Sequence, residues 1–310
     1  MSRPRKKGGS YQNPAAEVRA DVSRGYSVCA VVVTFHPGPD LAANLDLLSR
    51  QVDHIVVVDN GSSVETVSLL DLLEEQRSCT ILRNGMNLGI AAALNHGCQH
   101  AVENGFAWIV TFDQDSAVTE NFIQALLLDA GRVKDLGMIS PRYVDRHSGK
   151  VIPLPKTRSG SLITTLTSGS LFRTEVYRNA GPFNESLFID CVDIEYCLRL
   201  RSMQLCIAES AGAILVHSLG RTAVHKMLGK NLPVTNHSPW RRYYMTRNSL
   251  YVALRYPREL AWIRHISVAT FQDVIKILFF EEQKVTKLRL MIKGTVDCLF
   301  GRMGQRILIS

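Results

Sequence analysis

The chain has 310 residues, of which 46% are hydrophobic and 21% are charged, a composition that excludes a disordered chain. Its length suits one large domain with its own core. The net charge of +8 is uneven: residues 221–310 contain sixteen Lys or Arg and five Asp or Glu, whereas residues 26–220 contain fourteen and twenty-one. A basic end of this kind can meet nucleic acid, anionic lipid or a phosphorylated substrate.

Residues 1–25 are basic and lack an apolar run, so we expect a flexible tail in place of a secretory signal. The most apolar segment, residues 260–280, contains Arg264, Asp273 and Lys276, which argues against a membrane-spanning helix. Seven cysteines are scattered without a CxxC pair. They predict reduced thiols in a cytosolic protein, not a zinc site or a disulfide framework.

Buried strands and helices are predicted to alternate between residues 27 and 116. The strands are expected at 27–38, 54–63, 79–84 and 106–116, and the helices at 39–52, 68–76 and 89–105. This rhythm with short loops predicts an α/β fold with a doubly wound, mostly parallel, Rossmann-like sheet. Such sheets bind ligands at the carboxyl ends of their strands, where polar side chains gather at Thr34, Asp59, Asn60, Asp113 and Asp115.

The rhythm changes after residue 137. Residues 137–154 predict a hairpin, followed by a strand, a helix, a turn, and a helix from about Asp190 to Met203. One or two final strands end near His217. From residue 221 we expect a loop and then two long amphipathic segments, at about 240–256 and 259–300. We therefore divide the chain into a tail (1–25), a nucleotide-binding and catalytic domain (26–220) and a basic helical region (221–310).

Asp113 and Asp115 stand one residue apart in "FDQDS", after an apolar run. If the strand continues through both, their carboxylates point to one side and raise each other's pKa. A divalent cation removes that penalty, and Mg²⁺ or Mn²⁺ prefers carboxylate oxygens together with substrate phosphates. The alternative is a solvated turn in which Asp113 caps the following helix.

Two further strand ends carry candidate nucleotide contacts. Asp59 ends a strand, where it suits a base edge or a ribose hydroxyl; taken alone, its Asp-Asn-Gly context favours an Asx turn instead. Asn87 and Gly89 precede an Ala-rich helix whose N-terminus favours a phosphate, and plain helix entry is the alternative. This segment matches neither the GxGxxG motif nor a Walker loop, so a nicotinamide-binding or P-loop site is disfavoured.

The segment "FIDCVDIEY" brings further acids. If it is helical, Asp190 and Asp193 are neighbours on one face, either complementing the helix dipole or supplying a general base. His217 ends a predicted core strand, where it is either structural or a third metal ligand.

In this order the blocks resemble the GT-A nucleotide-sugar glycosyltransferases of the inverting family 2, especially the bacterial rhamnosyltransferase branch. The resemblance covers about residues 27–256 and rests on "VVVTFHPG", "VVVDNGSS", "NLGIAAALNHG", "FDQDS", "SGSLFRTEVYRNAGPFNESLFIDCVDIEYCLR" and "PWRRYYMTRNSLYVALRY". Two departures are Gln114 between the aspartates and Val192 in place of an acid. Because of them, the donor sugar follows from branch similarity alone.

The resemblance implies a metal-dependent, inverting transfer of a deoxysugar, with dTDP-L-rhamnose as donor and a lipid-linked or cell-surface glycan as acceptor. Asp193 is implied as the general base, and Asp113, Asp115 and His217 as ligands of Mg²⁺ or Mn²⁺. The implied nucleotide and donor contacts are Thr34, Phe35, Asp59, Asn60, Arg83, Asn87, Gly89, Asn95 and Gln114. The implied acceptor or orienting residues are Asp190, Glu195 and Gly169.

The basic C-terminal region leaves two interpretations open. "WRRYYMTRN" and "KVTKLRLMIK" mix cations with aromatic and aliphatic residues, as interfacial helices do. Such helices would hold a cytoplasmic enzyme on the inner face of an anionic membrane. The alternative is a solvated helical region whose cations pair with acids or bind the diphosphate. No nucleic-acid partner is implied, and a homo-oligomer stays open.

Other functions remain as alternatives. A transferase of the same fold with another nucleotide sugar comes first. A DxD phosphatase would need Thr or Val after the second aspartate, where Ser116 stands. A sugar-nucleotide pyrophosphorylase would need a Gly-rich basic loop where "TFHPGPD" stands. A non-catalytic lipid- or nucleic-acid-binding protein ranks low, because all the acids are in place.

Overall fold

The computed structural model describes residues 27–63, 70–75, 79–146, 149–217, 223–227 and 230–307; for residues 217, 223–227 and 230–233 it describes the backbone alone. The tail predicted for residues 1–25 and the side chain of His217 lie outside this description. All seven cysteines are free, as their spacing predicts. Within these ranges no helix is both long and apolar enough to cross a bilayer.

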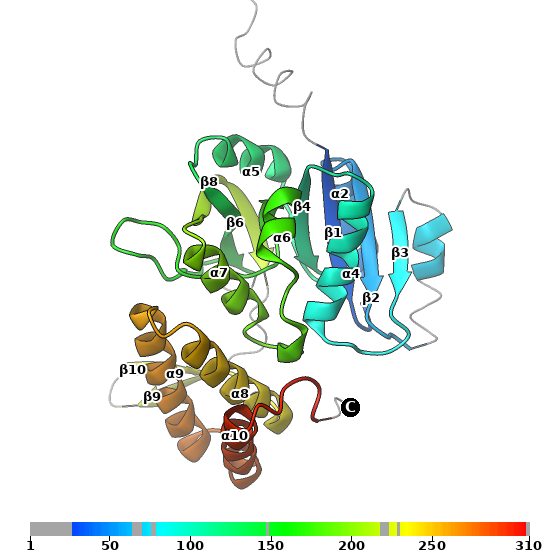
Figure 1. Ribbon diagram of the computed structural model, residues 1–310. Coiled ribbons are helices and arrows are strands. Elements are labelled where there is room, and N and C mark those ends of the chain that lie inside the picture. Colours follow the sequence, from blue (N-terminus) through cyan, green and yellow to red (C-terminus); the bar gives the residue numbers. More distant parts are fainter. Residues whose placement is uncertain are drawn as a thin grey trace, which may run out of the picture.

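The first half of the protein is a parallel sheet with the strand order β3-β2-β1-β4 (Figure 1). Its strands are β1 (Val28–Thr34), β2 (His54–Asp59), β3 (Cys79–Arg83) and β4 (Trp108–Asp113). Every pair among them is parallel, and the register sets Thr34 beside Asp59 and Val33 beside Asp113. The four predicted strands are therefore confirmed, and their polar ends meet at one edge of the sheet.

Both faces of this half are covered, which explains why its strands are apolar throughout. Alternate residues of β1 enter two separate cores. Helix α2 (Asp40–Ser49) packs Leu41 and Leu45 into one core, and α4 (Ile90–Glu103) covers the other. Gly97 lets α4 approach closely, because a Cβ there would lie 2.3 Å from Val31 Cγ1. The doubly wound sheet is thus confirmed.

The second half extends the same sheet in the order β4-β7-β6-β8-β5, with β6 and β8 parallel and the other pairs antiparallel. These strands are β5 (Ala117–Val118), β6 (Leu136–Asp145), β7 (Leu171–Arg173) and β8 (Cys206–His217). Helices α5 (Phe122–Ala130), α6 (Thr174–Ala180), η1 (Glu185–Leu187) and α7 (Val192–Ser202) connect them. The hairpin predicted at 137–154 is confirmed only in short form, since Val144 bridges Val151 antiparallel and the N–H of Ile152 donates to the carbonyl of Tyr143 at 2.9 Å.

The C-terminal region begins with a two-stranded hairpin of β9 (Ala223–Met227) and β10 (Lys230–Val234), where a loop was predicted. Three helices follow: α8 (Pro239–Arg255), α9 (Leu260–Phe279) and α10 (Lys284–Leu299). The predicted single segment 259–300 is therefore broken near Gln283, which has a φ of 50°. Buried Glu281 lies at the break and pairs with Arg242 and Lys287.

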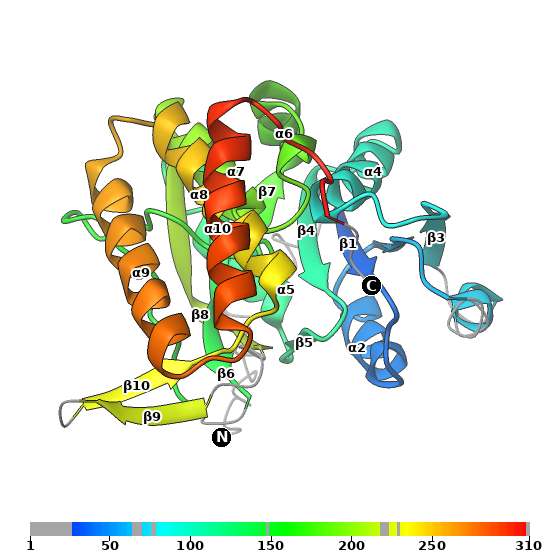
Figure 2. The same cartoon turned by 90° about the horizontal axis from the view of Figure 1, so that it is seen from below.

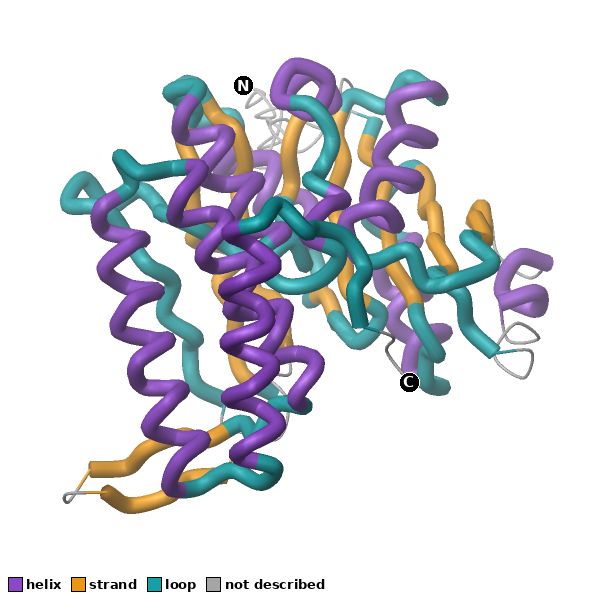
Figure 3. The backbone as a smooth tube through the Cα atoms, turned by 60° about the horizontal axis from the view of Figure 1, so that its bottom comes forward, coloured by secondary structure: helices purple, strands orange, loops and turns teal. Residues whose placement is uncertain are grey.

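The three helices pack below the carboxyl edge of the sheet, and α8 contacts α10 closely (Figures 1 and 2). Seen from below, α9 and α10 lie in front of α8 (Figure 2), and Figure 3 draws the helices of this region as purple tubes. Helix α8 lies between α10 and the segment that leads into α7. The region is therefore built onto the edge of the sheet where ligands are expected to bind.

Candidate active site

A cavity of about 480 Å³ opens at the carboxyl ends of β1 and β4. Eight of the predicted site residues line it: Thr34, Phe35, Asn60, Asn87, Gly89, Asp113, Gln114 and Asp115. Phe188, Ile189 and Arg241 close it from the C-terminal side. The prediction that strand-end polar residues gather at one place is confirmed for this set.

The DxD segment forms a turn at the floor of the cavity. Strand β4 ends at Asp113, so the prediction that the strand continues through Asp115 is wrong. Gln114 ties this turn to the end of β1, since its Oε1 accepts the backbone N–H of Phe35 at 2.8 Å. The backbone N–H of Asp113 donates to Ser168 Oγ at 3.1 Å. Both carboxylates nevertheless line the same cavity.

An asparagine network fixes the loop beside β2. Asn60 Nδ2 donates to Asn87 Oδ1 at 3.0 Å, and the same oxygen accepts the N–H of Gly89 at 3.0 Å. Gly89 has a φ of 90°, and a Cβ there would lie 2.5 Å from the carbonyl oxygen of Phe188. The N–H of Ile90 donates to that carbonyl at 2.8 Å. Gly89 therefore admits the Phe188 backbone, and part of the helix N-terminus is already occupied.

Eight predicted site residues are not among the described residues that line the cavity: Asp59, Arg83, Asn95, Gly169, Asp190, Asp193, Glu195 and His217. The first four are held by other contacts. Asp59 accepts bonds from the N–H and the hydroxyl of Ser62, which is the Asx-type turn that its sequence context also allowed. Arg83 forms surface ion pairs with acids of the 70–75 helix. Asn95 bonds the backbone of Phe183 at 2.8 and 2.9 Å. Gly169, with a φ of 78°, fits between Pro141 and Leu215. These residues support the site from behind.

The segment that leads into α7 has an irregular backbone. Phe188, Asp190 and Cys191 have φ values of 66°, 62° and 63°, which are unusual for residues with side chains. Helix α7 begins only at Val192, so the prediction that Asp190 and Asp193 share one helical face is wrong. Strained backbone of this kind is found at functional sites, where the surrounding structure holds it in place.

Two buried side chains of α8 hold this segment. Asn248 Nδ2 donates to the carbonyls of Leu187 at 2.8 Å, Ile189 at 2.6 Å and Asp190 at 3.0 Å. The Arg247 guanidinium also donates to the Leu187 carbonyl, at 3.0 Å. Both side chains are fully buried, so the interpretation of "WRRYYMTRN" as a lipid-facing stretch is wrong. They satisfy carbonyls that an irregular segment leaves without partners.

Three acids approach one another at the C-terminal side of the cavity. Asp190 pairs with Arg241 at 3.2 Å, while its second oxygen, Oδ2, is buried and has no hydrogen-bond partner among the described residues. Burial raises the pKa of Asp190, and Arg241 opposes the rise. Burial, assisted by the charges of Asp190 and Asp113, raises the pKa of Asp193 to about 6. A group with that pKa is ionised at neutral pH and still accepts a proton readily.

Arg241 was not predicted as a site residue. It is the only cation among the described residues that line the 480 Å³ cavity. Its position in "PWRRYY" offered one signal, namely the alternative that cations of the C-terminal region bind the diphosphate. The tandem Arg242 points elsewhere, since it pairs with Asp273 at 2.6 Å and with Glu281 at 2.5 Å.

Comparison with known proteins identifies the family. The profile of Glycosyl transferase family 2 matches residues 29–184. The dTDP-rhamnosyl transferase RfbF of Shigella flexneri is 30% identical over 297 residues, which cover 90% of this chain and 97% of RfbF. The chain belongs to glycosyl transferase family 2. The predicted family and the prediction of a glycosyltransferase are confirmed.

One further relative of this family 2 glycosyltransferase has a different enzyme name, and one solved structure shares its fold. The galactofuranosyltransferase GlfT1 of Mycobacterium tuberculosis is 27% identical, over 77% of this chain and 87% of GlfT1. The crystal structure of S. aureus TarS 1-349 in complex with UDP-GlcNAc aligns with a TM-score of 0.52 and 14% identity, over 89% of this chain and 73% of that chain. The structural likeness supports the GT-A fold and nothing finer.

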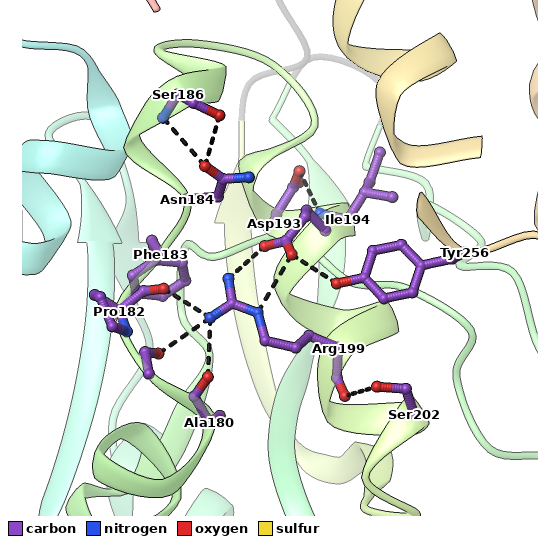
Figure 4. Close-up of polar contacts among 12 residues, drawn as sticks. Ala180, Pro182, Phe183, Asn184, Ser186, Asp193, Ile194, Arg199, Ser202 and Tyr256 are labelled. Carbon is purple, nitrogen blue, oxygen red and sulfur yellow. Dashed lines mark hydrogen bonds and ion pairs between the residues drawn. The ribbon is translucent and has the colours of Figure 1, made fainter. Parts of the chain in front are cut away.

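Glu195 of the family 2 enzyme does not line the 480 Å³ cavity. It lines a second cavity of about 1050 Å³, bounded by residues 182–186, α7, the end of α8 and residues 256–259. Glu195 forms an ion pair with Arg199 and accepts the hydroxyl of Tyr256 at 2.6 Å. Figure 4 shows Arg199 reaching the carbonyls of Ala180 at 3.0 Å and Pro182 at 2.7 Å. Glu195 therefore braces α7 from behind.

The residues present fit a divalent cation of the kind that family 2 enzymes commonly use. Asp113 and Asp115 offer hard carboxylate oxygens to one cavity, and the Asp113 charge contributes to the raised pKa of Asp193. Among the described side chains, no group of three or more His, Cys, Asp or Glu is placed to hold a metal. The backbone of His217 ends β8, beside Asp145, and its side chain is not described.

Proposed function

We propose that this enzyme transfers L-rhamnose from dTDP-L-rhamnose, with inversion, to a hydroxyl of a lipid-linked or cell-surface glycan. The observation that carries the proposal is a cavity lined by two carboxylates, Asp113 and Asp115, and a single cation, Arg241, together with a buried acid, Asp193, whose pKa the Asp113 charge helps to raise. The similarity to RfbF, whose name specifies a dTDP-rhamnosyl transferase, supports the donor.

The donor side of the proposal rests on charge. A nucleotide diphosphate is anionic, and Arg241 can donate to its oxygens from the C-terminal wall of the cavity. Asn60 and Asn87 are rigidly hydrogen-bonded, as a nucleotide-binding edge requires. Asp113 and Asp115 would hold Mg²⁺ or Mn²⁺, with His217 as a third ligand. The cation, when bound, stabilises negative charge on the diphosphate leaving group.

The acceptor side of the proposal rests on Asp193. Its carboxylate takes the proton of an acceptor hydroxyl while that oxygen attacks the anomeric carbon. The bond from the acceptor oxygen to the anomeric carbon forms as the bond to the diphosphate oxygen breaks. Attack opposite the leaving group inverts the anomeric centre. Asp190 offers a buried, unpartnered Oδ2 close to this place, which suits a bond from an acceptor hydroxyl.

The principal alternative is another nucleotide sugar, because GlfT1 is named a galactofuranosyltransferase and is also similar. Nucleotide sugars would be screened by thermal shift and by release of nucleotide diphosphate, each with and without Mn²⁺. The proposal expects dTDP-L-rhamnose to give the largest metal-dependent shift. A larger shift and faster turnover with a UDP-hexose would overturn the donor. Hydrolysis of p-nitrophenyl phosphate at a comparable rate would favour the phosphatase alternative.

The place of action follows from the acceptor. We propose a cytoplasmic enzyme that meets its glycan at the inner face of the membrane, either as a monomer or as a homo-oligomer. We also propose that residues 26–220 form the catalytic domain and 221–310 an accessory region. Arg241 qualifies that boundary, since α8 contributes it to the donor cavity.

A further inference from the structure

The outer surface of α9 and α10 is unusually apolar for a surface exposed to water. Eighteen large hydrophobic side chains are exposed in the described part of the chain, and ten of them belong to residues 260–300. Phe271 is 67% exposed and Phe300 is 72% exposed. A concentration of this kind marks an interaction surface, whereas single exposed apolar residues need no explanation.

The exposed residues follow helical spacing, so they form stripes and are not scattered. On α9 the stripe contains Leu260, Val268, Phe271 and Leu278, while Trp262 is buried on the inner side. On α10 the spacing is seven, four and three residues, and the stripe is Val285, Ile292, Val296 and Leu299. Both helices contact each other and lie on the side of the C-terminal region that faces the viewer in Figure 2.

The exposed charges of α9 and α10 are mainly positive, and Glu282 in the turn between the two helices is the exposed acid of residues 260–300. Arg264 on α9 and Lys284 and Arg289 on α10 are exposed and form no ion pair among the described residues. The acids of the same region are mostly neutralised, since Asp273, Glu281 and Asp297 each pair with a cation. Apolar stripes bordered by free cations match an anionic bilayer, which takes up the apolar side chains and attracts the charges.

We propose that this outer face, defined by the two stripes with Arg264, Lys284 and Arg289, docks the enzyme on an anionic lipid surface. A second copy of the chain fits less well, because its own free cations would oppose these. The proposal rests on the proposed function in one respect, since a lipid-linked acceptor would be presented at that surface. Helix α10 packs on α8, which carries Arg241, so docking places the donor cavity beside the membrane.

The test is co-sedimentation of the full-length protein with phosphatidylcholine vesicles, with and without phosphatidylglycerol. The parent protein is expected to bind the anionic vesicles and to lose binding as salt is raised. Phe271→Glu combined with Ile292→Glu should weaken binding by about tenfold or more, and each of Arg264→Gln and Arg289→Gln by about fivefold. The matched control, Leu47→Glu with Leu72→Glu, changes exposed residues on the other side of the protein and should bind as the parent does.

Three outcomes would overturn the proposal: no binding by the parent, equal binding to neutral vesicles, or equal loss in the control. A concentration-dependent dimer that Phe271→Glu abolishes would instead assign the face to a second copy. Binding of dTDP-L-rhamnose, measured by thermal shift without lipid, separates this proposal from the proposed function. A variant that loses vesicle binding but keeps donor binding is changed at the docking face alone. A variant that loses donor binding but keeps vesicle binding is changed at the active site alone.

Discussion

The guanidinium of Arg241, which lines the 480 Å³ cavity, forms an ion pair with Asp190 at 3.2 Å. The two residues are fifty-one positions apart and come from α8 and from the segment before α7. Arg241 is 43% exposed at its side chain, whereas Asp190 is 16% exposed. The arginine can therefore turn toward an incoming diphosphate, while the acid stays in the wall.

Arg241→Gln tests the donor role. We expect kcat/KM for the donor to fall about ten- to a hundredfold, as the loss of a charged hydrogen bond of about 1.5–3 kcal/mol predicts. Arg241→Lys should recover part of the loss, since it restores the charge without the planar geometry. Arg132→Gln removes an exposed surface cation and should leave the kinetics unchanged.

A double-mutant cycle with Asp190→Asn separates two explanations for Arg241. If Arg241 acts on the donor, Arg241→Gln still lowers kcat/KM when Asp190 is already neutral. If Arg241 only neutralises Asp190, the double variant performs as well as Asp190→Asn alone. The second result would remove Arg241 from the donor site.

Asp193→Asn tests the general base. We expect transfer to fall about 10²- to 10⁴-fold while donor binding is retained, because only the proton acceptor is lost. Glu195→Gln is the matched control from the same helix, since Glu195 faces the second cavity. It should lower the melting temperature through the Arg199 ion pair and leave transfer largely intact. Equal transfer by parent and Asp193→Asn would exclude Asp193 as the base.

The raised pKa of Asp193 also predicts the pH dependence of transfer. The base must be ionised to accept a proton. Therefore kcat/KM should decline below pH 6, where the carboxylate of Asp193 becomes protonated. Asp190→Asn removes one of the like charges that raise this pKa, so the acidic limb should move to lower pH. An acidic limb that stays at the same pH in both proteins would contradict the coupling between the two acids.

The parallel half of the sheet could be predicted because its strands are buried on both faces. Such strands read as continuous apolar runs, and β1 shows this directly, with alternate residues in two cores. The donor side of the site followed from the same pattern, since strand ends meet at one edge. The position of a residue at a strand end does not decide where its side chain points. Asp59 is held in a turn by Ser62, and Arg83 pairs with an acid on the surface.

The C-terminal contribution to the site could not be predicted, for a different reason. Asn248 and Arg247 bond backbone carbonyls about sixty residues earlier in the chain, and no periodicity encodes such partners. Cations in an amphipathic helix normally indicate a face exposed to water or to a membrane interface. Arg242 is buried instead, because Asp273 and Glu281 neutralise its charge. The strained start of α7, which places Asp190 before the helix, depends on those same contacts.

Asp115→Asn tests the metal site. Two carboxylates that share a cation lose affinity for it when one becomes neutral, so Mn²⁺ binding measured by titration calorimetry should weaken by about tenfold or more. EDTA should abolish transfer by the parent, and added Mn²⁺ or Mg²⁺ should restore it. Asp40→Asn changes an exposed acid at the start of α2 and should bind Mn²⁺ as the parent does. Unchanged Mn²⁺ affinity in Asp115→Asn would exclude this carboxylate as a ligand.

Glu281→Gln tests the ion cluster that holds the C-terminal helices together. Glu281 is buried and pairs with Arg242 at 2.5 Å and with Lys287 at 2.7 Å. Its neutralisation leaves two buried cations undercompensated, so the free energy of unfolding in urea should fall by about 3–5 kcal/mol. Arg132→Gln, which breaks an exposed pair with Asp129, should change it by about 1 kcal/mol or less.

The cluster acts by charge balance, and a second replacement can show this. Replacing Arg242, Glu281 and Lys287 together by Met, Leu and Met removes every charge of the buried trio at similar volume, although Asp273 then loses its Arg242 partner. Asp273 still has Lys276 at 3.8 Å, so the triple variant should recover much of the lost stability. If it is as unstable as Glu281→Gln, specific hydrogen bonds and not charge balance stabilise the junction that positions α8 and Arg241.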